Sequence, residues 1–144
     1  MANAREACGS IEMMLNEDLM RDQVNAGGFK IPNDTLPENP WTEREYLNAV
    51  EWLSEAKRTK HINQHRTSYG WKHTASNRLM EKHNNGDDYY ISNGAFIAAA
   101  IDLGFIVKRC AHAPRNAWLN ISKTAGKLAS PKVQVVFRCG GFLT

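Results

Sequence analysis

The stretch Ser92-Asn-Gly-Ala-Phe-Ile-Ala-Ala-Ala-Ile-Asp-Leu-Gly104 decides the fold of this protein. Ser92 is a typical helix N-cap and Gly104 a typical C-terminal stop, so the residues between them are expected to form a helix. Asp102 is the only charged residue of the stretch, and the helix is therefore apolar on nearly all sides. Because such a helix belongs in a core, the rest of the chain must cover it. We expect most of the aromatic core to come from Trp71, Phe96, Phe105 and Trp118.

The clearest helix start lies at Thr42. Thr42 and Glu45 have the spacing of a capping box, and Trp41 and Tyr46 occupy the two positions of a hydrophobic staple. The apolar face that follows predicts a helix that ends at about Lys57.

Two further helices are expected from the spacing of apolar residues. One starts near Ser68, because Trp71, Ala75 and Leu79 follow at four-residue intervals. The other is a short amphipathic helix over residues 10–21.

Strand-like patterns follow the apolar helix. Residues 105–107 and 118–121 are apolar runs separated by a turn at residues 114–116, which predicts an antiparallel hairpin, and residues 133–137 form a third run. The predicted fold class is α+β: a small helical domain of three to four helices followed by a short antiparallel β-hairpin or a three-stranded sheet.

The charge is divided unevenly along the 144 residues. Residues 1–56 contain four basic and eleven acidic side chains, whereas residues 57–144 contain fourteen basic and four acidic ones, so the net charge of +3 is a misleading average. Residues 25–40 are rich in Gly, Pro and Asn and are expected to be a loop. We therefore expect an acidic N-terminal helix and loop arm over residues 1–40 and a basic α+β domain over residues 41–144. The alternative is that the two parts complement each other's charge within one fold.

The basic part favours nucleic-acid binding, mainly by phosphate contacts. Cations neutralise phosphates, and aromatic rings among them can stack on exposed bases. The alternative is an ordinary solvated surface with Trp71 in the core. The predicted contact residues lie in the 57–82 stretch and in the hairpin: Lys57, Arg58, Lys60, Arg66, Tyr69, Lys72, Arg78, Lys82, Lys108, Arg109 and Arg115.

A helical unit followed by a hairpin invites comparison with a winged helix-turn-helix. Two features argue against it. The connection before Ser92 is about eight residues long, against a usual turn of 3–4 residues. The helix at residues 92–104 also offers hardly any side chain that could read base edges. Sequence-specific readout is therefore not expected.

Metal and catalytic sites are not expected. His61 and His65 are four residues apart, and Cys110 and His112 would share one side of a strand, but paired close ligand spacings of the zinc type are absent. The chain also lacks the motifs of nucleophilic hydrolases and of phosphate-binding loops. We expect a protein that is not an enzyme and needs no cofactor.

Three further observations predict the cellular compartment of the protein. The three cysteines are odd in number and widely spaced, which is typical of a reducing environment. No run approaches the ~18 apolar residues of a membrane span, and the N-terminus lacks a signal pattern. We expect a cytoplasmic protein without membrane contact.

Three blocks carry a resemblance: SYGWKH at residues 68–73, YISNGAFIAAAIDLGF at residues 90–105 and NAWLNIS at residues 116–122. Together they resemble small uncharacterised proteins of bacterial phages, plasmids and integrated mobile elements. The resemblance implies an accessory protein that acts in the cytoplasm of a bacterial host. It also opens an alternative to nucleic-acid binding: a non-enzymatic, anti-CRISPR-like inhibitor that binds a host defence protein complex. The acidic arm is then the candidate for a nucleic-acid mimic.

Overall fold

The computed structural model describes residues 21–32 and 40–126, which form an α+β fold with three helices and two small antiparallel sheets. The α+β class is therefore confirmed. Most of the helix expected over residues 10–21, and the strand expected at residues 133–137, lie outside the described residues. The elements are β1 (Val24–Asn25), β2 (Gly28–Phe29), α2 (Glu43–Glu55), β3 (Arg58–Asn63), α3 (Ser68–His83), α4 (Asn93–Asp102), β4 (Val107–Arg109) and β5 (Ala117–Ile121).

The order of elements differs from the prediction at β3. This strand lies between α2 and α3, and it pairs with β5 in a sheet of order β3-β5-β4. We had expected all strands after the last helix. The sequence of β3, Arg-Thr-Lys-His-Ile-Asn, has no apolar alternation, because β3 is an edge strand whose charged side chains face water.

The predicted loop over residues 25–40 contains part of a tight hairpin. β1 and β2 pair across Ala26 and Gly27, and the hairpin places Val24 and Phe29 in the hydrophobic core. Gly28 has a φ of +120°, and a Cβ there would lie 2.1 Å from the carbonyl oxygen of Arg115. A cut at residue 40 would therefore remove part of the core.

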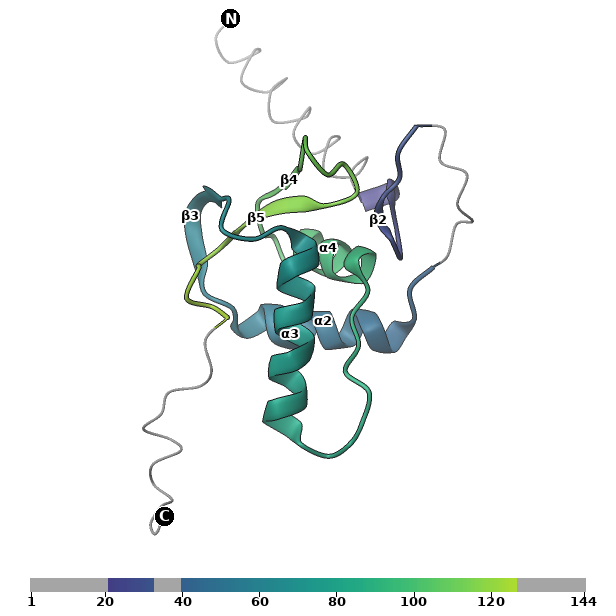
Figure 1. The fold of residues 1–144 in the computed structure, drawn as a ribbon, viewed down its shortest axis with the longest axis vertical. Coiled ribbons are helices and arrows are strands. Elements are labelled where there is room, and N and C mark those ends of the chain that lie inside the picture. The colour runs from purple at the N-terminus through teal and green to yellow at the C-terminus, as the bar shows by residue number, and fades with distance from the viewer. Residues whose placement is uncertain (1–20, 33–39, 127–144) are drawn as a thin grey trace, which may run out of the picture.

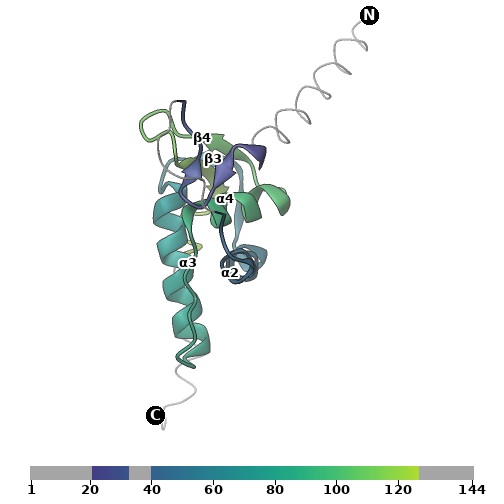
Figure 2. The same ribbon diagram turned by 90° about the vertical axis from the view of Figure 1, so that its right-hand side faces the viewer.

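Helix α4 forms the centre of the molecule, as predicted from its sequence. All six residues from Ala95 to Ala100 are fully buried, and Figures 1 and 2 show α4 between α2, α3 and the strands. Ser92 caps the helix through its Oγ, and Gly104 ends it with a φ of +85°.

The hairpin of β1 and β2 lies against the N-terminus of α4. The backbone N–H of Gly94 donates to the carbonyl of Ala26 at 3.0 Å. A Cβ on Gly94 would lie only 1.5 Å from the carbonyl oxygen of Asn25. Only glycine permits this close approach of two backbones.

Helix α2 begins with the predicted capping box. The side chain of Thr42 accepts from the backbone N–H of Glu45 at 3.1 Å, and the Glu45 carboxylate accepts from the backbone N–H of Thr42. On its buried face, the ring of Trp52 lies 5.8 Å from that of Trp71 and 6.0 Å from that of Phe96.

Trp118 differs from the prediction that it joins this aromatic core. Its neighbours Ala117 and Leu119 belong to the core, whereas Trp118 is only half-buried and lies outside the core cluster. Successive side chains of a strand point to opposite faces, so Trp118 points away from the core.

Buried polar side chains connect the elements. Asn120 of β5 donates to the Thr59 carbonyl of β3 at 2.9 Å and accepts from the Ile106 N–H at 2.8 Å, which fixes both edges of the sheet. Ser68 at the start of α3 accepts from the N–H of Ala117 at 3.0 Å. No helix among the described residues is long and apolar enough to cross a membrane.

Candidate functional site

Three of the eleven predicted binding residues, Lys57, Lys60 and Lys108, are exposed and form no ion pair or side-chain hydrogen bond with another described residue. Lys123, which the sequence analysis did not select, has the same character. Each of these lysines lies in or next to a strand of the three-stranded sheet. These four residues are termed the sheet lysines.

Carboxylates are absent from both segments that build this sheet. Residues 57–66 and residues 103–126 each contain four Lys or Arg side chains and no Asp or Glu. From residue 40 onward, the described carboxylates lie on α2, within residues 81–88, or at Asp102 of α4. Figure 2 shows α2 and the C-terminal end of α3 below the sheet, so the elements that carry most of these carboxylates lie to one side of it.

Asp102 directly precedes the segment of residues 103–126, and its carboxylate is engaged by two other side chains. Its Oδ1 accepts from Nε of Arg21 at 3.0 Å, and its Oδ2 accepts from the hydroxyl of Tyr46 at 2.6 Å. That hydrogen bond, with burial and the negative charge of Asp102, raises the pKa of Tyr46. Asp102 therefore compensates Arg21 rather than the sheet lysines.

Lys108 and Trp118 form a cross-strand pair on the sheet face away from the core. The two residues are direct partners in the register of β4 and β5. Directly opposite residues of an antiparallel pair lie on the same face, with Cβ atoms roughly 5 Å apart. The structure thus places a cation and an aromatic ring together, a combination that the sequence analysis missed because Trp118 was expected in the core.

Arg58 and Arg109 stabilise the fold. Nη2 of Arg58 donates to the Leu103 carbonyl at 2.7 Å, and its guanidinium lies 3.9 Å from the ring centroid of Phe105. Arg109 donates to Gln23 Oε1 at 3.0 Å and lies 4.6 Å from the ring centroid of Phe29. Both guanidinium groups are held by protein contacts of the type that fixes arginine orientation.

Arg66 and Arg78 are likewise engaged within the protein. Arg66 donates to the hydroxyl of Thr74 and lies 5.0 Å from the ring centroid of Trp71. Arg78 donates to the Gly126 carbonyl at 2.7 Å and forms an ion pair with Glu81.

Arg115 contributes to the packing through its backbone. This half-buried residue accepts, through its carbonyl, from the N–H of Phe29 at 2.9 Å. The side chain of Asn93 also donates to this carbonyl at 3.3 Å, so Arg115 connects the β1–β2 hairpin with the start of α4.

Lys82 lies in the last turn of α3 and contacts the C-terminal half of α2. Its Nζ is 3.2 Å from Glu51 and 3.6 Å from Glu55, and the hydrogen bond to Glu51 raises the pKa of Lys82. Burial of Glu51 opposes its ionisation, but hydrogen bonds from His83 and Lys82 outweigh it, so the pKa of Glu51 is lowered. Lys82 therefore belongs to an ion-pair network.

Lys72 is buried rather than solvated. Only 5% of its surface is exposed, and its Nζ lies 4.9 Å from the ring centroid of Tyr69 and 4.8 Å from that of Tyr90. Burial lowers the pKa of Lys72, although the negative charge of Glu45 acts in the opposite direction. Lys72 therefore differs from the exposed sheet lysines, because its side chain is covered by the two tyrosine rings.

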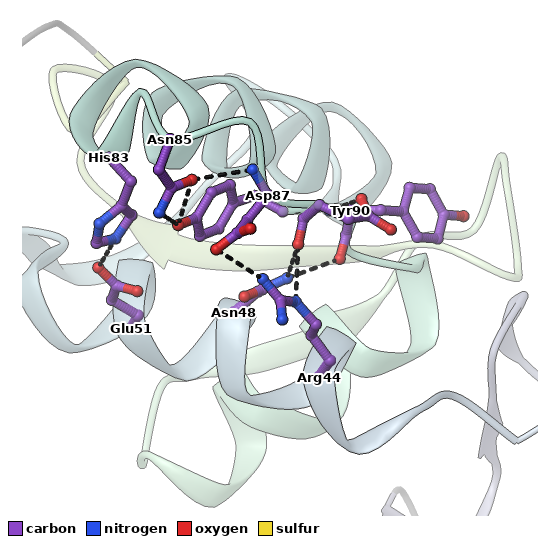
Figure 3. A network of polar contacts seen from close by, with 9 residues as sticks. Arg44, Asn48, Glu51, His83, Asn85, Asp87 and Tyr90 are labelled. Atoms are coloured by element: carbon purple, nitrogen blue, oxygen red, sulfur yellow. Dashed lines mark hydrogen bonds and ion pairs between the residues drawn. The ribbon is translucent and has the colours of Figure 1, made fainter.

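The loop between α3 and α4 is held by a polar network that Figure 3 shows from close by. Arg44 of α2 donates to the Asp88 carbonyl at 2.9 Å, and the buried Asn48 donates to the Tyr90 carbonyl at 3.2 Å. Asp88 also accepts from the N–H of Tyr90 at 2.9 Å, and Asp87 lies 3.7 Å from Arg44. The two adjacent aspartates thus stabilise a turn and anchor it to α2.

The residues considered for a metal site do not come together. His61 and His65 lie in and just after a strand, so the shared helical face that their spacing could provide does not form. Cys110 is buried, whereas His112 is exposed. Within the described residues, no group of three His, Cys, Asp or Glu side chains is gathered as metal binding requires.

The long connection and the burial of α4 also bear on recognition of DNA. Residues 84–92 separate α3 from α4, and α4 is enclosed by other elements over most of its length. Major-groove readout requires an exposed helix with polar side chains. This fold therefore offers the sheet, and not α4, as its candidate interface.

Comparison with known proteins found no relative: no family model, no curated protein and no solved structure matches the chain.

Proposed function

We propose that this protein binds nucleic acid without base specificity, through phosphate contacts of the sheet lysines Lys57, Lys60, Lys108 and Lys123. One observation carries the proposal: these cations lack ion-pair partners among the described residues, and the segments that build their sheet contain no carboxylate. Such a surface attracts phosphates, and the segments that build it contain no acidic side chain that would repel them. In this proposal the protein has no catalytic step.

The pair of Lys108 and Trp118 supports the same function. An ammonium group beside an aromatic ring suits a nucleotide, because the phosphate is charged and the base has a flat apolar face. Because α4 is buried, it cannot read base edges, and binding is expected to depend on salt more than on sequence.

The proposal is tested by fluorescence anisotropy with a labelled duplex at several salt concentrations. Lys60→Gln with Lys108→Gln removes two unpaired cations from the sheet. Since each phosphate contact contributes about 0.9 to the slope of log affinity against log salt, the slope should fall by about 1.8.

A matched control removes two cations that are already paired. Arg44→Gln with Lys82→Gln lowers the net charge equally, but Arg44 and Lys82 contact the protein's own acidic groups. We expect this control to keep most of the wild-type slope. Equal losses in the two variants would show that only net charge matters and would contradict an interface on the sheet.

A further inference from the structure

Lys72, Tyr69 and Tyr90 form a cluster at the surface of the protein. Tyr69 and Lys72 lie near the start of α3, and Tyr90 lies in the loop that precedes α4. The tyrosines are 51% and 49% exposed, whereas Lys72 between them is almost entirely buried. Figure 3 shows the ring of Tyr90 pointing away from the polar network that holds its loop.

The ammonium group of Lys72 has no hydrogen-bond acceptor among the described residues. Its neighbours are the two tyrosine rings, and Glu45 acts on it only through its charge. Within the described residues, the fully sealed polar side-chain atoms without a partner are Trp71 Nε1 and Asn93 Oδ1. Lys72 Nζ is not among them, so the two rings do not seal it completely.

An ammonium group without a hydrogen-bond acceptor among the described residues suits an anion, and half-exposed tyrosine rings suit a flat apolar group. His73 stands edge-on to Tyr69 at 4.7 Å and supports that ring from the same helix. A nucleotide combines the two properties, because its phosphate accepts hydrogen bonds and its base stacks on aromatic rings.

We infer that the cluster of Tyr69, Lys72 and Tyr90 binds one nucleotide of a single-stranded nucleic acid, with the phosphate on Lys72 and the base against a tyrosine ring. Bases within a duplex are stacked on each other, so the cluster selects unpaired strands. The inference rests on the proposed function and deepens it, since it names the form of nucleic acid.

The cluster also adjoins the sheet. Ser68, the neighbour of Tyr69, accepts from the N–H of Ala117 in β5. The sheet lysines supply phosphate contacts that do not distinguish single from double strands, while the cluster adds base stacking.

The experiment compares two labelled probes, a short oligothymidylate strand and a duplex. Tyr69→Leu with Tyr90→Leu should weaken binding of the single strand roughly fivefold to a hundredfold, because each stacked base contributes about 1–3 kcal/mol, and should leave duplex binding unchanged. Tyr69→Phe with Tyr90→Phe keeps both rings and should restore single-strand binding. Thermal unfolding of each variant shows whether it is folded.

A second variant tests the phosphate contact without altering the rings. Lys72→Met keeps an unbranched side chain and should reduce the salt slope of single-strand binding by roughly 0.7, the contribution of one phosphate on a single strand. The double variant Tyr69→Leu with Tyr90→Leu, termed the leucine variant, decides the outcome. If its single-strand affinity is unchanged, or if it loses equal affinity for both probes, the cluster is not a nucleotide site.

The sheet variant Lys60→Gln with Lys108→Gln separates this inference from the proposed function. If that variant lowers the duplex salt slope while the leucine variant changes nothing, the sheet binds and the cluster does not. If the leucine variant weakens single-strand binding while the sheet variant has no effect, the cluster binds and the sheet does not.

Discussion

Lys60 and Lys72 carry the same side chain in opposite environments. Lys60 projects from an edge strand into water, whereas Lys72 is enclosed by Tyr69 and Tyr90. Both belong to one basic stretch of the sequence, and the type of residue does not distinguish them. Their difference arises because Lys72 shares the buried face of α3 with Trp71, Ala75 and Leu79.

The burial of Lys72 predicts a pH-dependent cost to stability. Because its pKa in the folded protein is lowered from 10.5, the unfolded chain binds more protons, and stability rises with pH between the lowered pKa and 10.5. The cost is fully present below the lowered pKa. Lys72→Met removes the charge and keeps contact with both rings through its sulfur. We expect it to raise the free energy of unfolding by about 1 kcal/mol at neutral pH.

Urea unfolding of Lys72→Met and the wild type across the alkaline range checks this prediction. The difference between the two proteins should shrink as pH approaches 10.5. Lys60→Met serves as the control, because its exposed side chain has no such cost. Parallel pH profiles for Lys72→Met and the wild type would refute the explanation.

Among the secondary-structure elements, α2, α3 and α4 follow their local sequence signals closely. The capping box of Thr42 and Glu45, the apolar spacing after Ser68 and the stop at Gly104 each depend on residues within one or two turns. The hairpin of β4 and β5 was likewise predicted from two apolar runs and a turn. β3 was not, because an edge strand needs no apolar face and its polar sequence resembles a loop.

Two glycines in helices give opposite predictions for substitution by alanine. Gly94→Ala places a Cβ 1.5 Å from the Asn25 carbonyl oxygen, which pushes the β1–β2 hairpin from α4 and should cost about 3 kcal/mol. Gly70→Ala meets only an ordinary contact of 3.5 Å to the Arg66 side chain and should stabilise α3 by about 0.5–1 kcal/mol.

Thermal and urea unfolding of the two variants measure these effects. Gly70→Ala is the control for the substitution itself, since both positions are helical. Wild-type stability in Gly94→Ala would show that the hairpin does not pack closely on α4.

For the whole molecule, the central property is that α4 is covered from several sides. α2, α3, the β1–β2 hairpin and β4 all contact it, and the hairpin belongs to the chain before residue 40. The acidic arm inferred from composition therefore includes residues that complete the core. The division of the chain at residue 40 remains a prediction about charge. Truncation at that residue would remove the core side chains of Val24 and Phe29.

Two truncations separate the roles of the N-terminal residues. Deletion of residues 1–39 removes Val24 and Phe29 from the core and should lower stability by more than about 3 kcal/mol. Deletion of residues 1–20 keeps both side chains and removes four carboxylates, those of Glu6, Glu12, Glu17 and Asp18. We expect it to retain a cooperative unfolding transition and nucleic-acid binding.

Calorimetry and anisotropy on both truncations check this expectation. In the inhibitor alternative, the acidic arm binds a host defence complex. That alternative predicts that deletion of residues 1–20 abolishes binding to the complex, and it assigns no role to nucleic-acid binding. Loss of nucleic-acid binding on deletion of residues 1–20 would contradict the assignment of binding to the sheet.

The sequence by itself determined the buried helix, the helix caps, the final hairpin and the uneven charge. These features depend on residue type and on neighbours a few positions away, which is information that a sequence contains directly. Only the tertiary structure decided that β3 is a strand, that Lys72 is buried, and that the four sheet lysines have no ion-pair partner in the described part of the chain. Each of these features depends on contacts between residues that are distant in the sequence, such as the pairing of Arg58 with Ile121. The hydrophobic and electrostatic free energies of such contacts arise only when the chain folds.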